Sequence, residues 1–252
     1  MTEYLNKNDD NTQEHKMIEY TVQVDSHYTK WYINKKLHRE NGPAVESTTG
    51  NKMWYLNGHR HRTDGPAIEW ENGNKMWYLY GQLHRENGPA VECNDGKKVW
   101  YSNDDIHRTD GPAVELPNGT KEWYLNGQRH REDGPAIEYT NGDKWWYLNG
   151  QLHRTDGPAV ESTNGDKSWY LRGQLHREDG PSVEWNNGTK KWYLNGQLHR
   201  EDGPAFESIN GDKEWYLNGY AVTEAAVMKP VKQLTIAEIE GLLGHRIEVI
   251  AG

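Results

Sequence analysis

The segment WYLNGQLHRTDGPAVESTNGDKS, from Trp146 to Ser168, decides how this chain folds, because close variants of it follow one another along most of the sequence. A Trp opens each variant, and these residues are spaced by 23 positions without insertion or deletion. A fixed period of this length predicts a tandem-repeat architecture, in which each repeat buries its apolar surface against its neighbours. The positions are Trp31, Trp54, Trp77, Trp100, Trp123, Trp146, Trp169, Trp192 and Trp215.

Two Asn-Gly pairs in the quoted repeat, Asn149-Gly150 and Asn164-Gly165, predict β-hairpins, because a two-residue type I′ turn needs positive φ at both central residues. Between them, Asp156-Gly157-Pro158 predicts a third reversal. The predicted fold class is therefore all-β: an elongated tandem-repeat antiparallel sheet or a β-solenoid, with a small C-terminal helix-strand element. Two strands per repeat in one sheet would add about 9 to 10 Å per repeat, and a solenoid would add less.

Register follows if both Asn-Gly turns are two-residue loops, since residues equidistant from a turn then face each other. Trp146 is expected opposite His153, and Val160 opposite Trp169. On this register Trp, Leu, His and Val share one face of the sheet, while Tyr, Ala, Arg and Glu share the other.

The repeat pattern also predicts the organisation of the chain. Residues 1–30 are expected to form a polar lead-in and a capping strand at Glu19–Val24, and residues 31–219 eight repeats plus a terminal half repeat. Residues 220–252 are expected to form a helix-strand cap or a small docking element.

The tail carries its own helix signals. Thr235 with Glu238 three residues later forms a capping-box pattern, apolar residues follow at helical spacing, and Gly244 suits the position just after a helix. A short strand is expected at Arg246–Ile250.

Composition narrows the class of protein further. Hydrophobic residues make up 34% of the chain, with 12 Trp, 15 Tyr and one Phe, so burial must come mainly from Trp and Tyr. The net charge is −9, but acidic and basic residues alternate without a basic patch, which disfavours nucleic-acid binding. The single cysteine, Cys93, excludes an internal disulfide framework. An apolar run near 18 residues and a signal-peptide pattern are both missing, so we expect no membrane insertion and a cytoplasmic location.

The W-Y-x-N-G core, which recurs every 23 positions over residues 31–219, resembles the MORN repeat family and its bacterial variants. The longer pattern W-Y-L-N-G-x-x-H-R-x-D-G-P-A is similar to a repeat in proteins of large-genome bacteriophages and other large DNA viruses. The resemblance implies β-hairpins in an extended sheet, binding of protein or lipid headgroups, and no catalysis. The His-Arg-x-Asp-Gly-Pro-Ala half replaces the Gly-rich half of the eukaryotic form, which counts against lipid binding.

Residues shared by all repeats are interpreted as structural. We expect each His to pack against a Trp, and each following Arg to pair with the next Asp through charge-assisted hydrogen bonds. Successive His residues lie about two strands apart, too far to share a metal ion at the roughly 2 Å ligand distance. Equal copies of a Glu in every repeat also give no singular catalytic constellation, so we expect no enzyme, metal or cofactor. The structural set comprises Trp54, Trp77, Trp100, Trp123, Trp146, Trp169, Trp192, His61, His84, His130, His153 and His176.

Positions that vary between repeats are the better candidates for contact with a partner. They are the residue two after the central Val or Ile and the residue before each Trp, and several are extra aromatics of the kind that is over-represented at binding hot spots. An alternative is that they fill gaps between neighbouring repeats. The candidates are Trp70, Trp145, Trp185, Tyr139, Met53 and Met76.

These observations favour a non-enzymatic, virus-encoded repeat scaffold that binds a protein partner, for example a host defence protein in the host cytoplasm, and acts by occlusion. Three alternatives remain open: a sponge that sequesters an anionic nucleotide signal, a DNA mimic and a structural virion component.

Overall fold

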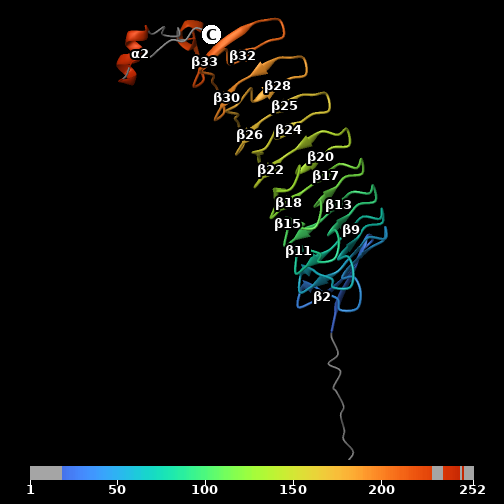
Figure 1. The fold of residues 1–252 in the computed structure, drawn as a ribbon. Helices are drawn as coiled ribbons and strands as arrows, with labels where there is room; N and C mark the ends of the chain where they lie inside the picture. Colours follow the sequence, from blue (N-terminus) through green and yellow to red (C-terminus); the bar gives the residue numbers. More distant parts are fainter. Residues whose placement is uncertain (1–18, 229–234, 245, 247–252) are drawn as a thin grey trace, which may run out of the picture. The chain divides into compact units, whose positions relative to one another are not determined.

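The computed structural model describes residues 19–228, 235–244 and 246, and the regular secondary structure of these residues is almost entirely β. The chain divides into two compact units, Met1–Gln128 and Arg129–Gly252, which we call unit 1 and unit 2. Repeated antiparallel hairpins fill both units, so the predicted all-β class is confirmed (Figure 1). The predicted division into lead-in, array and cap stays a prediction.

Each repeat contributes two short strands to a main sheet and a separate two-stranded hairpin. In unit 1 the main-sheet strands, each antiparallel to the next, are β2 (Tyr28–Ile33), β4 (Val45–Ser47), β5 (Lys52–Met53), β8 (Ile68–Glu69), β9 (Lys75–Met76), β12 (Val91–Glu92), β13 (Lys98–Val99), β16 (Val114–Glu115) and β17 (Lys121–Glu122). In unit 2 they are β20 (Ile137–Glu138), β21 (Lys144–Trp145), β24 (Val160–Glu161), β25 (Lys167–Ser168), β28 (Val183–Glu184), β29 (Lys190–Lys191), β32 (Phe206–Glu207) and β33 (Lys213–Leu217).

The separate hairpins form a second row. In unit 1 they are β6 (Tyr55–Leu56) with β7 (His59–Arg60), β10 (Tyr78–Leu79) with β11 (Gln82–Leu83), and β14 (Tyr101–Ser102) with β15 (Asp105–Ile106). Strand β18 (Tyr124–Leu125) follows, and β19 (Gln128–Arg129) spans the residues at which the units divide. In unit 2 they are β22 (Tyr147–Leu148) with β23 (Gln151–Leu152), β26 (Tyr170–Leu171) with β27 (Gln174–Leu175), and β30 (Tyr193–Leu194) with β31 (Gln197–Leu198).

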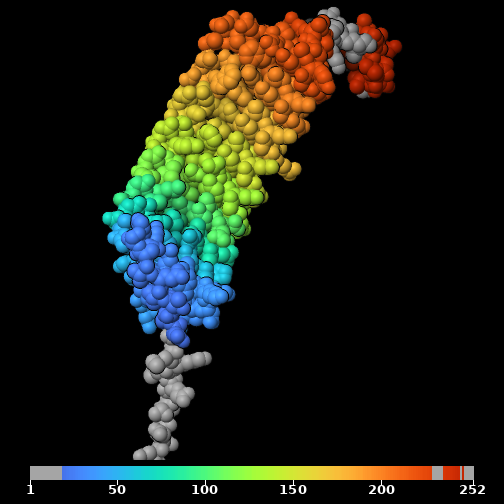
Figure 2. All heavy atoms as spheres, turned by 180° about the vertical axis from the view of Figure 1, so that it is seen from behind, coloured from blue at the N-terminus to red at the C-terminus, as the bar shows by residue number. Residues whose placement is uncertain are grey.

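Neighbouring repeats are joined by backbone hydrogen bonds in both rows. In the hairpin row, the N–H of Gly173 donates to the carbonyl of Leu152 (2.8 Å) and the N–H of Arg154 to that of Tyr170 (3.1 Å). Within each unit, successive repeats follow one another in chain order in the space-filling view (Figure 2). Because main-sheet strands of neighbouring repeats pair antiparallel, the pairing matches the sheet rather than the solenoid alternative.

The first Asn-Gly turn has the predicted register. Asn149 (φ 50°) and Gly150 (φ 77°) both have positive φ, and Leu148 pairs with Gln151 across them. The N–H of His153 donates to the carbonyl of Trp146 at 3.1 Å, so the predicted opposition of these two residues is confirmed.

The second Asn-Gly turn differs from the prediction, because its loop has three residues. Val160 pairs with Ser168 instead of Trp169. The N–H of Gly165 donates to the carbonyl of Ser162 (2.9 Å), and the N–H of Ser162 donates to the carbonyl of Asp166 (3.0 Å). This is a type I turn followed by a glycine with positive φ, the common geometry of three-residue hairpins. The extra loop residue shifts the register by one and turns each side chain of the strand to the opposite face.

The predicted grouping of side chains on the two faces is therefore wrong. Val and Ile share a face with the residue before each Trp, and Tyr side chains contact that residue: Tyr124 donates its Oη to Glu122 (2.9 Å), and the ring of Tyr147 lies 6.5 Å from that of Trp145. Arg is on the same side as Trp instead, with the guanidinium of Arg154 centred 4.1 Å from the Trp146 ring.

The core lies between the Gly-Pro turn of each repeat and the main-sheet strand that follows it. A small residue there is fully buried in every repeat, at 0% exposure: Ala44, Ala67, Ala90, Ala113, Ala136, Ala159, Ser182 and Ala205. The neighbouring Val or Ile is also buried in several repeats, with Ile68 at 2% and Ile137 at 1% exposure. The carbonyls of Ala44, Ala67, Ala90, Ala113, Ala159, Ser182 and Ala205 each accept the N–H of a Trp, as from Trp146 to Ala159 at 2.8 Å.

The other face of the main sheet carries alternating charges. Lys52 lies between Glu46 and Glu69 in unit 1, and Lys167 lies between Glu161 and Glu184 in unit 2. Opposite charges on directly opposed strand positions contribute roughly 0.2 to 1 kcal/mol per pair. The alternation noted in the sequence is thus a cross-strand ladder.

A further ladder links the three-residue turns. The N–H of Asn94 donates to Oδ1 of Asn74 in the preceding repeat at 2.8 Å. One repeat further along, the position of the acceptor Asn74 is occupied by Lys97, and the position of the donor Asn94 is occupied by Pro117, which has no N–H. The acceptor and the donor are therefore both replaced at the same step of the ladder. Equivalent bonds join Glu71 to Asn51, Thr163 to Asp143 and Asn186 to Asp166.

Replacing the turn glycine with alanine is expected to cost more at Gly142 than at Gly188. Both residues have similar φ (93° and 92°), so both substitutions carry the strain of a left-handed residue, about 1 kcal/mol. A Cβ at Gly142 would lie 2.7 Å from Cγ2 of Thr163, whose hydroxyl is held by Asp143, whereas Gly188 has nothing within 4 Å. We expect a loss of about 2 kcal/mol for Gly142→Ala and about 1 kcal/mol for Gly188→Ala in urea denaturation. Equal losses would contradict the turn geometry.

The two ends partly match the predicted elements. At the start, β1 (Thr21–Val24) pairs with β2, which also pairs with β3 (Lys36–Leu37), so a strand lies within the predicted range Glu19–Val24. At the end, β33 pairs with β34 (Tyr220–Val222), and α1 (Glu224–Val227) packs on β33 and buries Val227. Residues 1–18 lie outside the described residues.

The predicted tail helix is confirmed as α2 (Ile236–Leu243). Thr235 and Glu238 form the capping box, and Gly244 has the left-handed conformation (φ 74°). Of the strand predicted at Arg246–Ile250, all but the first residue lie outside the described residues.

Candidate functional site

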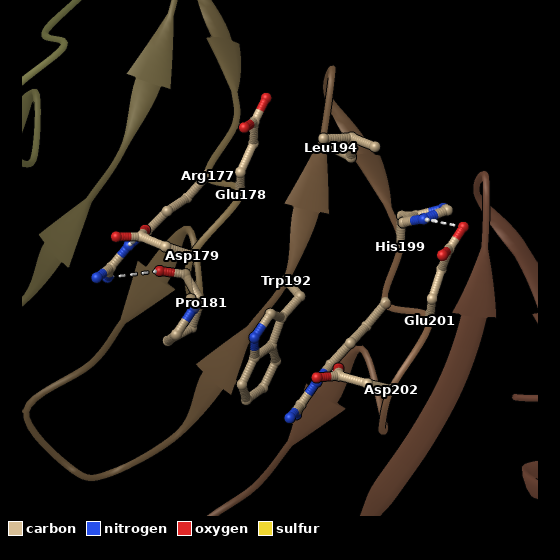
Figure 3. Close-up of a pocket in the computed structure, with 11 residues that line it drawn as sticks. Arg177, Glu178, Asp179, Pro181, Trp192, Leu194, His199, Glu201 and Asp202 are labelled. Atoms are coloured by element: carbon tan, nitrogen blue, oxygen red, sulfur yellow. Dashed lines mark hydrogen bonds and ion pairs between the residues drawn. The ribbon is translucent and has the colours of Figure 1, made fainter. Parts of the chain in front are cut away.

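Grooves open between neighbouring repeats on the side that carries Trp and Arg. One of them has a volume of about 880 Å³ and lies between residues 177–181 of one repeat and Trp192, Leu194 and residues 199–202 of the next. Figure 3 shows Trp192 between the Asp179–Pro181 segment on one side and Asp202 on the other. Equivalent grooves recur with the same residue types, two of them in unit 1 (residues 62–87 and 84–110) and two more in unit 2 (residues 131–156 and 154–179).

An arginine fixed from several directions builds the wall of each groove. In the central repeat of unit 2, the guanidinium of Arg154 stacks on Trp146, and its Nε donates to Asp156 at 2.9 Å. Its Nη1 donates to the carbonyl of Pro158 (3.2 Å) and to Glu161 (2.8 Å). A planar, always charged guanidinium suits this combination of stacking and forked hydrogen bonding. The predicted Arg-Asp pair is confirmed, and Glu161 is a second partner.

Six of the seven arginines that line these grooves contact two carboxylates each, so the groove surface is not basic. The seventh, Arg85, pairs with Glu92, and Asn87 stands where the other six have an Asp. The hydrogen bond from Arg154 holds the pKa of Asp156 below its usual value, so the carboxylate stays ionised. Its side chain is nevertheless 80% exposed at the groove edge.

The groove edges of the two units differ in charge. Glu132, Glu178 and Glu201 occupy the position between Arg and Asp in unit 2, with side chains at least 82% exposed. The groove at residues 177–202 therefore has two arginines and four carboxylates in its lining. The groove at residues 62–87 has Thr63 and Glu86 at this position and Asn87 in place of an Asp, so its lining has two arginines and two carboxylates.

The histidines join successive repeats through a contact that the sequence did not indicate. In each case Nδ1 accepts the N–H of the first turn residue in the following repeat, as from Arg172 to His153 at 3.1 Å. A nitrogen that accepts an N–H carries no proton of its own, so this hydrogen bond requires the tautomer with the proton on Nε2. The same bond is made by His38, His61, His84, His107, His130, His176 and His199.

Acidification is expected to destabilise the array before the Asp-Arg pairs titrate. Burial lowers the pKa of His61, so its stabilising contribution is present above the unfolded-state pKa of about 6.5 and is lost as pH falls through the lowered value. Protonation on Nδ1 would also remove the acceptor for the N–H of Tyr80. Thermal melting should therefore shift to lower temperature between about pH 7.5 and pH 5. A His61→Gln variant should show a smaller shift, and an unchanged melting temperature in the parent chain would contradict this role.

The predicted partner-contact residues lie outside the grooves. Tyr139 and Trp145 come together, with ring centroids 5.6 Å apart, and Nε1 of Trp145 is buried without a hydrogen-bond partner. Met53 and Met76 flank Ile68 in the main sheet and are half-buried.

The two remaining aromatic candidates each begin a three-residue turn. Trp185 is 38% exposed, with Nζ of Lys191 at 4.9 Å from its ring centroid, while Trp70 is half-buried. All six candidates therefore belong to the Val/Ile face of the main sheet. Their role in partner binding stays a prediction.

No protein-family model matches the chain, and no curated protein matches it. Across residues 19–228 and 235–244, no helix has the length and apolar character needed to cross a membrane. The same part of the chain contains no group of three or more His, Cys, Asp or Glu that could hold a metal ion.

Proposed function

We propose that this chain is a non-enzymatic repeat scaffold that binds a protein partner along its row of grooves. The supporting observation is the recurrence of one groove, with the same Arg, Asp, Trp and His lining, in both units. Trp and Arg are enriched at binding hot spots, and side chains held by several contacts lose little conformational entropy on binding. Catalysis instead needs one singular constellation, which equivalent grooves do not favour.

The groove chemistry favours this function over binding of an anionic signal. The Arg154 guanidinium already contacts two carboxylates and a Trp ring, so it is neutralised before any ligand arrives. The exposed edges carry Asp and Glu, which repel nucleotide phosphates.

Groove spacing counts against a DNA mimic. Two main-sheet strands per repeat place groove edges about 9 to 10 Å apart. Duplex DNA carries one charge per roughly 1.7 Å of axis, a much denser array. No groove feature favours a structural virion component. A virus-encoded inhibitor that occludes a host defence protein is a specific form of the scaffold proposal, and it rests on the resemblance of the repeat alone.

Affinity purification of the full chain from lysate of the cells that produce it tests the proposal. Thr155 is exposed in the lining of two grooves, so Thr155→Trp should fill them without entering the core. Thr140 is exposed in a three-residue turn of the same unit and provides a matched control, Thr140→Trp. We expect the parent chain and Thr140→Trp to recover the same stoichiometric protein and Thr155→Trp to lose it. Recovery of no stoichiometric protein, or equal loss with both variants, would contradict the proposal.

A further inference from the structure

We propose that the grooves of unit 2 bind an extended basic segment of the partner in which every third residue is Lys or Arg. This inference rests on the proposed function and specifies the chemistry of its partner. It depends on three observations: the excess of carboxylates at these grooves, their apolar walls and the spacing of the repeats.

The charge of the groove lining determines which charge the bound side chain must carry. In the groove at residues 177–202, Arg177 and Arg200 each point their Nε to an Asp and their Nη1 to a Glu of the main sheet, so both positive charges are already paired. Glu178 and Glu201 add further carboxylates at the edge, with side chains 84% and 82% exposed. A cationic side chain is the complementary occupant.

The groove walls suit a long aliphatic stem. Pro181, Trp192 and Leu194 line the same groove as the exposed carboxylates. Lys and Arg side chains place their methylene groups along apolar surface while the charged end stays near polar groups and water. One groove can therefore hold one such side chain, with its charge at the acidic edge.

Repeat spacing determines the conformation of the segment. Each repeat adds two main-sheet strands, so neighbouring grooves are about 9 to 10 Å apart. A polyproline II segment has three residues per turn and rises about 3.1 Å per residue, which repeats a side-chain direction about every 9.3 Å. In a β-strand, side chains point in the same direction about every 6.6 Å, which does not match the distance between neighbouring grooves. The grooves at residues 131–156, 154–179 and 177–202 thus match basic residues at positions i, i+3 and i+6.

Two synthetic peptides of equal composition provide the test. The first has three Lys-Pro-Pro triplets, and the second places three consecutive Lys between two Pro triplets. We expect isothermal titration of the full chain to give at least about tenfold tighter binding for the spaced peptide, because only it reaches three grooves at once. Equal affinities would overturn the inferred spacing, and binding of neither peptide would overturn the inference as a whole.

Two triple variants, each of which removes three carboxylates, locate the binding. The groove variant Glu132→Thr, Glu178→Thr and Glu201→Thr adopts the residue found at the equivalent positions Thr63, Thr109 and Thr155. The control Asp143→Asn, Asp166→Asn and Asp212→Asn adopts the residue found at the equivalent turn positions Asn51 and Asn74. We expect about tenfold weaker binding of the spaced peptide by the groove variant and less than about twofold change in the control.

Equal weakening by both variants would show that net charge alone attracts the peptide, which would overturn the inference. Circular dichroism melting of both variants confirms that each is folded. If Thr155→Trp abolishes recovery of a stoichiometric partner while neither peptide binds, this inference fails and the proposed function stands.

Discussion

Replacement of Arg154 by leucine is expected to lower the free energy of unfolding by about 3 kcal/mol. The side chain is only 21% exposed, and its removal leaves Glu161 and the carbonyl of Pro158 without their donor. It also removes the guanidinium from the face of Trp146. Loss of one partner from a largely buried ionic network typically costs about 3 to 5 kcal/mol, and partial solvent access places the expected value at the lower end.

Two further substitutions separate charge from geometry. Arg154→Lys keeps the charge but loses the planar fork, so we expect about half of the leucine effect. Asp156→Asn should have only a small effect, because that side chain is 80% exposed. Urea denaturation measures all three, and a lysine variant as stable as the parent chain would contradict the stacked, forked role of the arginine.

Replacement of Ala159 by leucine is expected to destabilise the chain by about 2 to 3 kcal/mol. Ala159 has 0% exposure, so the larger side chain must displace the atoms packed around it. Overpacking of this kind typically costs about 1 to 3 kcal/mol.

The chain itself supplies the control for this substitution. Ser182 holds the equivalent position at 0% exposure, and its Oγ accepts the N–H of Tyr193 at 2.7 Å. Ala159→Ser should therefore cost less than about 1 kcal/mol in the same denaturation experiment. If the leucine and serine variants were equally stable, the small-residue column would not be the packing constraint described above.

The fold class and the first turn could be predicted from sequence because both depend on local chemistry. Asn149-Gly150 accepts positive φ at both residues, and the period of 23 residues requires every repeat to fold alike. The register of the second turn could not be predicted by the same rule. Asn164-Gly165 is compatible with a two-residue loop and also with a three-residue loop that needs positive φ only at the glycine. The choice depends on pairing between strands, which sequence spacing does not reveal.

The grooves could not be predicted from the sequence for a related reason. They are built from residues shared by the repeats, which the sequence pattern assigns to structure, and they exist only as space between neighbouring repeats. One signal was present in the two residues that follow each groove Arg. In unit 1 they are Glu-Asn or Thr-Asp, with one carboxylate each, whereas in unit 2 three of the four pairs are Glu-Asp, with two carboxylates, at Glu132, Glu178 and Glu201. This asymmetry indicates where charge accumulates, although the sequence does not show that a groove lies beside it.

Hydrogen–deuterium exchange of the full chain, alone and with the protein recovered by affinity purification, tests most directly whether the grooves receive the partner. Binding in the grooves predicts slower exchange at residues 131–135, 154–158 and 177–181. Slower exchange confined to the three-residue turns at residues 162–166 and 185–189, with the groove loops unchanged, would contradict it.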